Sequence, residues 1–493
     1  MLQLLWAMYV ASFMGILAFS LMELQLVVVG WIRKNNTQLP ALLTDTLPSD
    51  LPNVTVQLPI FNEQYVAARI IDAVVALQYP RQCLQIQVLD DSTDQTLLIS
   101  QQKIAHYQAL GYNISLLHRH HRTAYKAGAL QAALPLATGS FVALFDADFV
   151  PSPNFLLHSL PYFDQAKVGA VQTRWGHLNR NYSLLTRIQA FFIDTHFAVE
   201  QSGRTAGNFC LNFNGTAGIW RKTTITDAGG WQADTLTEDL DLSYRAQLKG
   251  WTIAFVEHII CPAELPADMR AFKLQQHRWI KGGVETLKKM LPQIWQGKLS
   301  IAQKINATAH LLSSSIYIAI LLNAIVSGVL LFAHAAALPP YVAQYVYLYT
   351  LSNVALLSIG FTTWYKSRQV GQFFWADWVW LFPFCLAISF GMSAHNTWAA
   401  WQGYMGKKSA FERTPKFNLV QTADNWQQKR YTHYRLGIMW WIELALLGYF
   451  VTALAYAWHT KQYVFVIQHA LATLGFGMMV YYGWLHYWQT RQK

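Results

Sequence analysis

The sequence predicts a doubly wound α/β domain that is inserted between transmembrane α-helices. Hydrophobic residues make up 53% of the 493 residues, and their long runs are concentrated at the two ends of the chain. Charged residues make up only 13%, against about 25% in ordinary soluble proteins. In the middle, short β-branched runs alternate with helical periodicity, which is typical of a sheet covered by helices. We therefore expect an N-terminal transmembrane helix (1–34), an α/β domain (50–290) and a C-terminal membrane region (291–493).

The first apolar run, residues 4–32, is long enough to cross a bilayer, which takes about 20 residues. A signal peptide is the alternative, but its apolar region would have about 7–15 residues and would follow a basic segment. Arg33 and Lys34 end the run, so the positive-inside rule places the residues after them in the cytosol. Residues 35–52 contain several prolines and are expected to be a linker.

The middle of the chain is expected to contain alternating strands and helices. Residues 54–58, 84–89, 141–145 and 168–173 have the composition of buried strands, and residues 63–77 have helical periodicity. In a doubly wound sheet, ligands bind at the carboxyl ends of the strands. We therefore expect the functional site at that edge.

Net charge and cysteine spacing narrow the functional classes. The formal net charge is +11, but there is no long basic run or recognition motif, so we expect no nucleic-acid partner. Many basic residues flank apolar segments, which suits an anionic membrane surface or a pyrophosphate-bearing substrate. The cysteines lack the paired spacing of a zinc site and suit a reduced, cytosol-facing domain. They are Cys83, Cys210, Cys261 and Cys385.

The C-terminal region is expected to contain four more spans and one element at the membrane surface. Residues 307–338, 341–365, 434–458 and 464–488 are long apolar runs. Segment 373–401 is rich in aromatic residues but also contains polar ones. If it crossed the membrane, the basic segment that follows would face outside, so the positive-inside rule favours an interfacial or re-entrant position over a sixth span.

Acidic residues stand where two of the expected strands end. Asp90 and Asp91 follow one strand, and Asp146 and Asp148 follow another. An aspartate after a strand is usually a turn residue, but two such groups at one sheet edge favour a ligand site. Asp146 and Asp148 offer hard oxygen ligands that suit Mg²⁺ or Mn²⁺. Such a metal would neutralise a departing nucleoside diphosphate.

Two further groups complete a candidate transfer site. Lys126, followed by Gly128, is placed to act as a point charge on a phosphate, although a solvated helix start is the alternative. A transfer to a hydroxyl also needs a general base. Asp239 is our candidate, and its neighbour Glu238 would raise its pKa or orient it. The alternative for both carboxylates is a first helical turn that complements the helix dipole.

Gln275, Arg278 and Trp279 form the last candidate group. Their spacing puts Gln275 and either Arg278 or Trp279 on one face of a helix. Arginine can hold a pyrophosphate through two hydrogen bonds, and tryptophan offers a flat face to a sugar ring. A helix at the membrane interface is the alternative, but the acidic motifs upstream favour a substrate-binding role.

Together these residues resemble the processive family 2 glycosyltransferases, the group of cellulose, chitin and hyaluronan synthases. That family has the pattern Asp, Asp-x-Asp, Asp and Gln-x-x-Arg-Trp, which Asp91, Asp146 with Asp148, Asp239 and the Gln275 motif match in order. The most similar branch is the cellulose-synthase-like group of mannan, glucomannan and glucan synthases and their bacterial relatives. The resemblance covers residues 50–290 and implies a GT-A-type, nucleotide-sugar-binding fold. The matching stretches are VQLPIFNE (56–63), QVLDDSTD (87–94), YKAGAL (125–130), FNGTAGIWR (213–221) and QQHRW (275–279).

The resemblance also implies a role for each matching residue. The nucleotide side of the site would comprise Pro59, Asn62, Glu63, Asp91, Lys126, Asp146 and Arg278. The metal would lie on Asp146 and Asp148, and Asp239 would be the base beside Glu238. The acceptor side would comprise Phe213, Asn214, Gly215, Thr216 and Trp279, next to Gln275.

A loop around residues 404–420 resembles the gating loop Phe-x-Val-Thr-x-Lys of cellulose synthases, which closes over the bound nucleotide. The matching residues are Phe411, Thr414 and Lys416, whereas Arg413 replaces the valine. The resemblance implies that Thr414 and Lys416 contact the nucleotide. It also places this loop on the cytosolic side of the membrane.

We therefore expect a multi-pass membrane enzyme, an inverting and processive β-glycosyltransferase. It would need Mg²⁺ or Mn²⁺, polymerise a β-1,4-linked glucan or mannan, and pass the growing polysaccharide across the bilayer. UDP-glucose is the favoured donor on family frequency, with GDP-mannose as the alternative. A bacterial inner membrane is favoured over a Golgi membrane, and accessory export subunits are candidate partners.

Two other functions remain open on sequence alone. An enzyme that adds one sugar to a membrane lipid would share the fold and a related Arg-Trp motif. A transporter or membrane scaffold with a degenerate enzyme domain is the second alternative. Against the second, every acidic motif of the family pattern is present.

Overall fold

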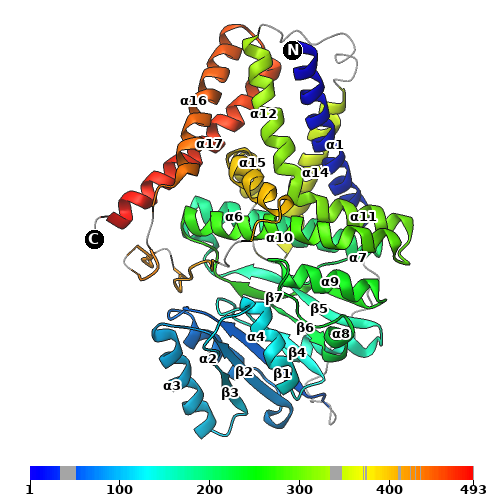
Figure 1. Cartoon of the computed structure of the whole chain (residues 1–493), viewed down its shortest axis with the longest axis vertical. Coiled ribbons are helices and arrows are strands. Elements are labelled where there is room, and N and C mark those ends of the chain that lie inside the picture. Colours follow the sequence, from blue (N-terminus) through cyan, green and yellow to red (C-terminus); the bar gives the residue numbers. More distant parts are fainter. Residues whose placement is uncertain are drawn as a thin grey trace.

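The computed structural model describes residues 1–33, 51–333, 347–369, 371, 375–408, 412–421, 423–427, 429–432 and 435–491. The predicted linker falls almost entirely on residues 34–50, and Phe411 of the predicted gating loop is also outside the described residues. Figure 1 shows three layers: a mixed α/β domain, a set of helices lying across it, and a bundle of long helices above them.

The described part of the α/β domain contains a seven-stranded sheet with the order β3-β2-β1-β4-β6-β5-β7. Strands β1 to β4 pair in parallel, whereas β6 runs antiparallel to both β4 and β5, and β5 and β7 are again parallel. The predicted α/β fold is therefore confirmed, with one antiparallel strand in the sheet. The strands are β1 Val54–Ile60, β2 Leu84–Asp90, β3 Ile114–Leu117, β4 Phe141–Leu144, β5 Val168–His177, β6 Gly218–Arg221 and β7 Thr252–Ala263.

The burial of the strands explains why the four strand positions predicted from the sequence were accurate. Nearly every residue of β1 and β4 is buried, because helices cover both faces of the sheet, and such strands are almost continuously apolar. Helix α2 presents its apolar stripe, including Ile70 and Val74, to the sheet. The helices of the domain are α2 Ala67–Val75, α3 Gln95–Ala109, α4 Tyr125–Ala133, α5 Phe155–Ser159, α6 Leu184–Thr195, α7 Ser202–Gly207, α8 Lys222–Asp227 and α9 Glu238–Leu248.

Helices α6, α10 and α11 lie between the sheet and the bundle (Figure 1). Helix α10 is amphipathic, and it packs against α9 on the side of the α/β domain and against α15 on the side of the bundle. A buried ion pair between Lys273 and Glu443, 2.6 Å, ties α10 to α16. The remaining helices are α1 Leu2–Ile32, α10 Met269–Gln296, α11 Ile301–Leu312, α12 Ile316–Phe332, α14 Tyr347–Gln369, α15 Trp375–Tyr404, α16 Ile438–His459 and α17 Tyr463–Arg491.

Five helical stretches within the described residues are long and apolar enough to cross a membrane. They are Leu2–Ile32, Ile301–Phe332, Asp377–Tyr404, Ile438–His459 and Tyr463–Arg491. The predicted spans at 307–338, 434–458 and 464–488 have counterparts here. Helix α14, which overlaps the predicted span 341–365, is not among the five, since tyrosine, serine and threonine lower its hydropathy.

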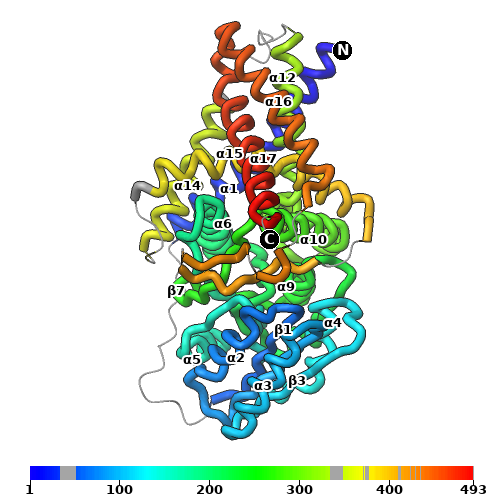
Figure 2. Tube along the Cα trace, turned by 90° about the vertical axis from the view of Figure 1, so that its left-hand side faces the viewer, coloured from blue at the N-terminus to red at the C-terminus, as the bar shows by residue number. Residues whose placement is uncertain are grey.

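Helix α15 is apolar enough to cross a membrane, although we predicted an interfacial or re-entrant position for 373–401. Figures 1 and 2 show that α15 runs crosswise to α12 and α16 rather than alongside them. It contacts α10, α12 and α17. The composition of α15 is therefore compatible with a transmembrane span, whereas its orientation in the bundle favours an interfacial position. The interfacial position of this helix stays a prediction.

The crossing of α15 and α17 depends on close backbone contact, which gives a stability prediction. A Cβ atom at Gly475 would overlap the carbonyl oxygen of Ala387, whereas a Cβ at Gly477 would have Leu447 as its nearest atom, 3.8 Å away. Gly475→Ala should therefore lower stability by about 1–3 kcal/mol through overpacking. Gly477→Ala should be neutral or stabilising, because alanine favours the helix. Thermal unfolding in detergent measures both, and equal melting temperatures would contradict the prediction.

Candidate active site

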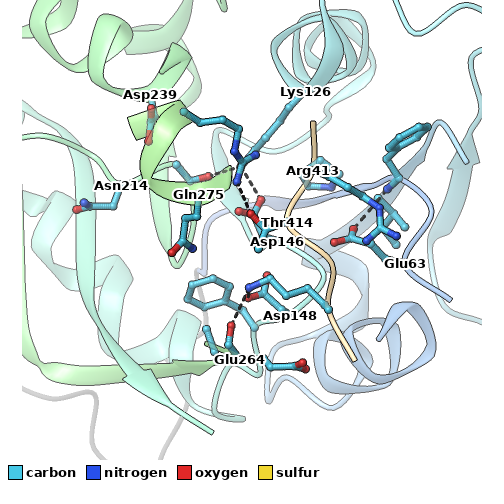
Figure 3. A pocket seen from close by; sticks show the side chains of 18 of the residues that line it. Glu63, Lys126, Asp146, Asp148, Asn214, Asp239, Glu264, Gln275, Arg413 and Thr414 are labelled. Carbon is cyan, nitrogen blue, oxygen red and sulfur yellow. Dashed lines mark hydrogen bonds and ion pairs between the residues drawn. The ribbon is translucent and has the colours of Figure 1, made fainter. Parts of the chain in front are cut away.

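A cavity of about 200 Å³ lies at the carboxyl ends of the strands and brings together most of the predicted residues. Figure 3 shows these side chains converging from the sheet, from α4 and α10, and from the segment 412–421. The roles of these residues remain predictions, but their assembly in one cavity is a property of the fold. The predicted residues that line it are Pro59, Glu63, Asp91, Lys126, Asp146, Asp148, Asn214, Gly215, Glu238, Asp239, Gln275, Arg278, Trp279, Thr414 and Lys416.

Three predicted residues do not line this cavity. Asn62 occupies a turn at φ +53°, where its side-chain oxygen accepts the Thr93 N–H, 2.8 Å. Phe213 is fully buried in the core. Thr216 supports the site from behind, since its hydroxyl accepts the Asp146 N–H, 2.8 Å. Their predicted roles in nucleotide and acceptor binding stay predictions.

Asp146 and Asp148, the two candidate metal ligands, each form an ion pair with a lysine. Lys126 Nζ lies 2.5 Å from Asp146 Oδ1, and Lys416 Nζ lies 2.5 Å from Asp148 Oδ2. Burial opposes the charge of Lys126, but Asp146 and Glu238 outweigh it and raise the pKa of this lysine. Two carboxylates that already attract cations fit a divalent metal that takes its other ligands from a diphosphate and water. The chemistry of this donor set therefore suits Mg²⁺ or Mn²⁺.

Glu264, directly after β7, is a site residue that the sequence analysis missed. Its carboxylate accepts the Phe417 N–H, 2.7 Å, and its backbone oxygen accepts the Lys416 ammonium, 2.7 Å. Burial raises the pKa of Glu264, against the opposing effect of Lys416. Glu264 thus anchors the segment 412–421 over the cavity. Its position after a strand end was the available signal, because it repeats the pattern of Asp91 and Asp146.

Asp239 and Glu238 open helix α9 at the opposite wall. Gly215, at φ +77°, brings its backbone against the Asp239 carboxylate, where a Cβ atom would lie 2.8 Å from Oδ2. Burial, and then the neighbouring charge of Glu238, raise the pKa of Asp239 to about 7. A carboxylate with such a pKa can accept a proton near neutral pH.

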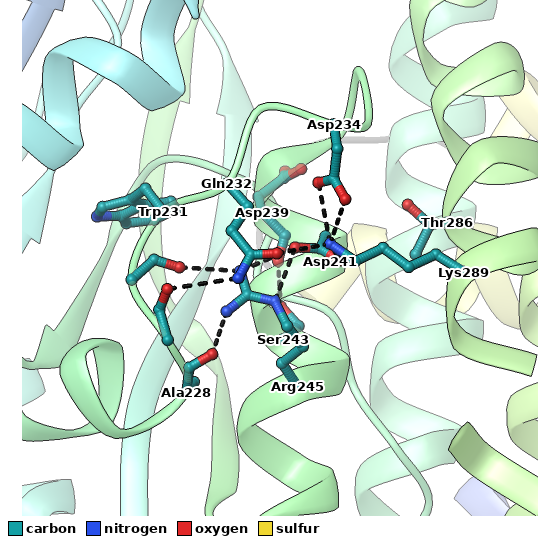
Figure 4. Close-up of polar contacts among 12 residues, drawn as sticks. Ala228, Trp231, Gln232, Asp234, Asp239, Asp241, Ser243, Arg245, Thr286 and Lys289 are labelled. Atoms are coloured by element: carbon teal, nitrogen blue, oxygen red, sulfur yellow. Dashed lines mark hydrogen bonds and ion pairs between the residues drawn. The ribbon is translucent and has the colours of Figure 1, made fainter. Parts of the chain in front are cut away.

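Asp241, two residues further on, has a different environment (Figure 4). It is fully buried, and its two carboxylate oxygens pair with Arg245 and Lys289, each at 2.8 Å. Lys289 also pairs with Asp234. The pair with Lys289 therefore holds α9 against α10, the pair with Arg245 lies within α9, and Asp241 is not among the residues that line the cavity.

Sequence reasoning did not identify two arginines near the nucleotide side: Arg122 lines the cavity, and Arg119 binds the cavity residue Asp91. Arg119 holds both oxygens of Asp91, at 2.9 and 2.5 Å. Arg122 lies over the ring of Phe61, 3.6 Å from its centroid. Burial raises the pKa of Glu63 to about 7, although Arg413 opposes the shift. These basic residues precede the Lys126 motif in a His- and Arg-rich stretch, which was the only signal for them.

The motif on α10, which consists of Gln275, Arg278 and Trp279, contacts the segment 412–421 at the cavity. Arg278 Nη2 donates to the Thr414 hydroxyl, 3.0 Å. Burial lowers the pKa of Arg278, while Asp146 and Glu238 oppose this shift and keep a cation favourable here. The predicted nucleotide contact by this segment remains a prediction, but its position over the cavity is clear (Figure 3).

Comparison with known families agrees with this geometry. Residues 52–282 match the family model described as "Glycosyltransferase like family 2". This part of the chain is a family 2 glycosyltransferase domain. The match begins just before β1 and ends within α10, so it includes the acidic motifs and the Gln275 motif, while segment 412–421 lies outside it.

Curated plant proteins are the most informative relatives of this glycosyltransferase domain. Glucomannan 4-beta-mannosyltransferase 2 of Arabidopsis thaliana is 41% identical over 255 residues, which is 51% of this chain and 48% of the relative. Glucomannan 4-beta-mannosyltransferase 1 of Oryza sativa subsp. japonica is 38% identical over 301 residues, 59% of this chain and 56% of the relative. The chain spans about half the length of the curated relatives that it matches.

A solved structure shows the same fold. It is a mannosyltransferase from Pyrobaculum calidifontis in complex with GDP-Man and Mn²⁺, with a TM-score of 0.53 and 20% identity. The match covers 82% of this chain and all of the other chain. At this level of identity the comparison establishes a shared fold only.

The contrast between Asp241 and Asp239 predicts opposite effects on stability. Asp241→Asn breaks a buried ion pair, which costs about 3–5 kcal/mol. Asp239→Asn should leave stability unchanged or raise it. The pKa of Asp239 is higher in the folded protein than in the unfolded chain, so its negative charge destabilises the folded state at neutral pH, and asparagine removes that charge. Denaturation of the two purified variants at neutral pH measures this difference. Equal losses of stability would show that Asp239 is also a structural residue.

Proposed function

We propose that the protein is a membrane-embedded, inverting, processive glycosyltransferase that polymerises a β-1,4-linked mannan-type polysaccharide from GDP-mannose. The observation that carries the proposal is the assembly of Asp239 with Asp146, Asp148 and Lys126 in one cavity. The relatives named glucomannan 4-beta-mannosyltransferases support a mannosyl donor. The sequence analysis favoured UDP-glucose on family frequency. The names of these relatives do not support a glucosyl donor, so UDP-glucose becomes the second donor to test.

The residues divide the reaction between them. Lys126, Arg278 and Lys416 would bind the diphosphate, and Asp146 and Asp148 would hold the divalent metal. When bound, that metal would neutralise negative charge on the departing nucleoside diphosphate. Of Mn²⁺ and Mg²⁺, Mn²⁺ is the first metal to test, because the fold neighbour from Pyrobaculum calidifontis is a complex with GDP-Man and Mn²⁺.

The acceptor would react from the opposite wall. Asp239 takes the proton of the acceptor hydroxyl as that oxygen bonds to the anomeric carbon, while the bond from this carbon to the phosphate oxygen breaks. Attack from the side opposite the leaving group inverts the anomeric centre. Asn214 and Trp279 line the cavity on this side and would contact the acceptor sugar.

A second cavity supports the polymer as product. It has a volume of about 390 Å³, shares Leu236 and Arg278 with the first cavity, and is lined by α10, α15 and the start of α16. Space next to the site and bordered by membrane helices suits a growing chain that leaves towards the bilayer. The same space also admits a lipid acceptor, so transfer of one sugar to a lipid remains the second candidate.

Product analysis tests the proposal. Purified protein should incorporate labelled mannose from GDP-mannose, with Mn²⁺ or Mg²⁺, into a product that is long and cleaved by a β-1,4-mannanase. Chelation of the metal and Asp239→Asn should each abolish incorporation. A single labelled sugar on lipid would favour the second candidate, and incorporation from UDP-glucose alone would overturn the donor assignment.

The pH dependence of transfer should report Asp239. Transfer at saturating donor should fall as the pH drops through about 7, because the protonated carboxyl cannot act as a base. Glu238→Gln removes a like charge, so the acid limb should move to lower pH. Glu63→Gln is the matched control, since Glu63 also has a pKa of about 7 but lies on the nucleotide side. An acid limb that moves in the control and not in Glu238→Gln would contradict the assignment.

The cellular location and the partners belong to the same proposal. Helices long and apolar enough to cross a membrane flank the glycosyltransferase domain on both sides. We expect a multi-pass membrane protein with its catalytic domain in the cytosol. A bacterial inner membrane, a Golgi membrane and accessory export subunits all stay predictions.

A further inference from the structure

Between α6 and α7 the chain forms a π-helical turn, His196–Gln201. The three elements follow one another without a break, from Leu184 to Gly207. Single π turns within α-helices are rare and often occur at functional sites. Neither the sequence motifs nor the proposed mechanism uses this turn.

The π turn holds both ends of one side chain in the cavity wall. Asn214 Nδ2 lies 2.9 Å from His196 Nε2, and Asn214 Oδ1 accepts from Gln201 Nε2 at 2.9 Å. Because an amide NH₂ group can only donate, His196 Nε2 must accept, and the proton of the ring lies on Nδ1. That nitrogen donates to Glu200 Oε2, 3.0 Å. The orientation of the Asn214 amide is therefore determined at both ends.

The π geometry explains how two residues five positions apart reach the same amide. In an α-helix with 3.6 residues per turn, residues five apart are separated by about 140° around the axis. A π turn closes its hydrogen bonds between residues five apart, which brings such residues above one another. His196 and Gln201 thus share a face because of the widened turn.

This clamp lies next to the reacting groups. Asn214 lines the catalytic cavity. The next residue, Gly215, packs against the Asp239 carboxylate, and its carbonyl oxygen accepts from Lys126 at 3.0 Å. A rotation of Asn214 would therefore change the wall that faces an acceptor, beside the base.

The other side of the π turn is tied to the membrane helix α1. Glu200 pairs with Arg204 at 3.1 Å, and burial of this glutamate is outweighed by His196 and Arg204, which lower its pKa. A Cβ atom at Gly203 would lie 2.6 Å from the Leu26 carbonyl oxygen, so α7 and α1 touch through their backbones. The turn consequently lies between a membrane helix and the acceptor wall.

We propose that His196 and Gln201 are positioning residues that orient Asn214 for the acceptor sugar. This inference rests on the proposed glycosyltransferase function. Neither residue lines the cavity, and Asn214 is the cavity residue that both of them contact. Gln201 also donates to the Asn212 carbonyl oxygen, 2.7 Å. The nucleotide side is one step further away, since Lys126 reaches this wall through the Gly215 carbonyl oxygen.

The test compares His196→Leu and Gln201→Leu with a matched control, Thr205→Val. Thr205 donates to the Gln201 carbonyl oxygen, 2.8 Å, and has no part in the Asn214 clamp. Each clamp variant loses its hydrogen bond to Asn214 and one more, from His196 to Glu200 or from Gln201 to the Asn212 carbonyl oxygen. Each should lower kcat/KM for an oligomannoside acceptor about fivefold to tenfold or more. GDP affinity and donor hydrolysis by water should stay at the wild-type level. His196→Gln, whose amide oxygen can still accept from Asn214, should restore most of the loss.

Hydrogen–deuterium exchange of peptides covering residues 212–217 gives a readout that does not need activity. Exchange should rise in both clamp variants and stay unchanged in Thr205→Val. Unchanged exchange, or a parallel loss of acceptor use and donor hydrolysis, would overturn the inference. An inactive wild type whose clamp variants still show raised exchange would instead refute the proposed function and leave the clamp itself intact.

Discussion

The pairing of clustered, partly buried carboxylates with lysine and arginine is the constraint on which this structure depends. Asp146, Asp148 and Glu238 stand around one small cavity with Asp239. Burying several like charges together is strongly unfavourable unless cations offset them. Lys126 and Lys416 supply two of these cations by direct contact, at 2.5 Å each. A diphosphate with its metal would bring negative and positive charge together, which matches the mixture of lysines and carboxylates in this cavity.

The same constraint connects the two halves of the protein. Lys416 and Thr414 belong to the segment between α15 and α16, which are helices of the membrane region. Glu264 after β7 holds this segment over the cavity. The cavity is thus completed by residues that lie between α15 and α16 in the chain, and α10 lies between the α/β domain and the helical bundle (Figure 1).

The sequence predicted what depends on pattern and missed what depends on three-dimensional contacts. Asp91 and Asp146 were found because strand ends can be read from local periodicity, and Asp239 was proposed because a transfer to a hydroxyl needs a general base. Arg119 and Glu264 were missed, since their partners are distant in sequence or lie on another strand. Asn62 and Phe213 matched family motifs, but neither lines the cavity. The Asn62 side chain bonds to the Thr93 N–H in a turn, and Phe213 is buried in the core.

Two further features were beyond local reasoning. Hydropathy alone does not decide how α15 lies, because an aromatic-rich helix buried among other helices resembles one that faces lipid. The π turn at His196–Gln201 was not predicted, because the motifs and periodicities of the sequence did not mark this segment. Both features arise from packing between elements.

A structure of the protein with GDP and Mn²⁺ would test the central claim most directly. Our account predicts the metal on Asp146 and Asp148, with the diphosphate beside Lys126 and Arg278 and the ammonium of Lys416 released from Asp148. The Asp239 carboxylate would face the acceptor side of the same cavity. Nucleotide bound elsewhere, or Lys416 still paired with Asp148 while nucleotide and metal are bound, would contradict it.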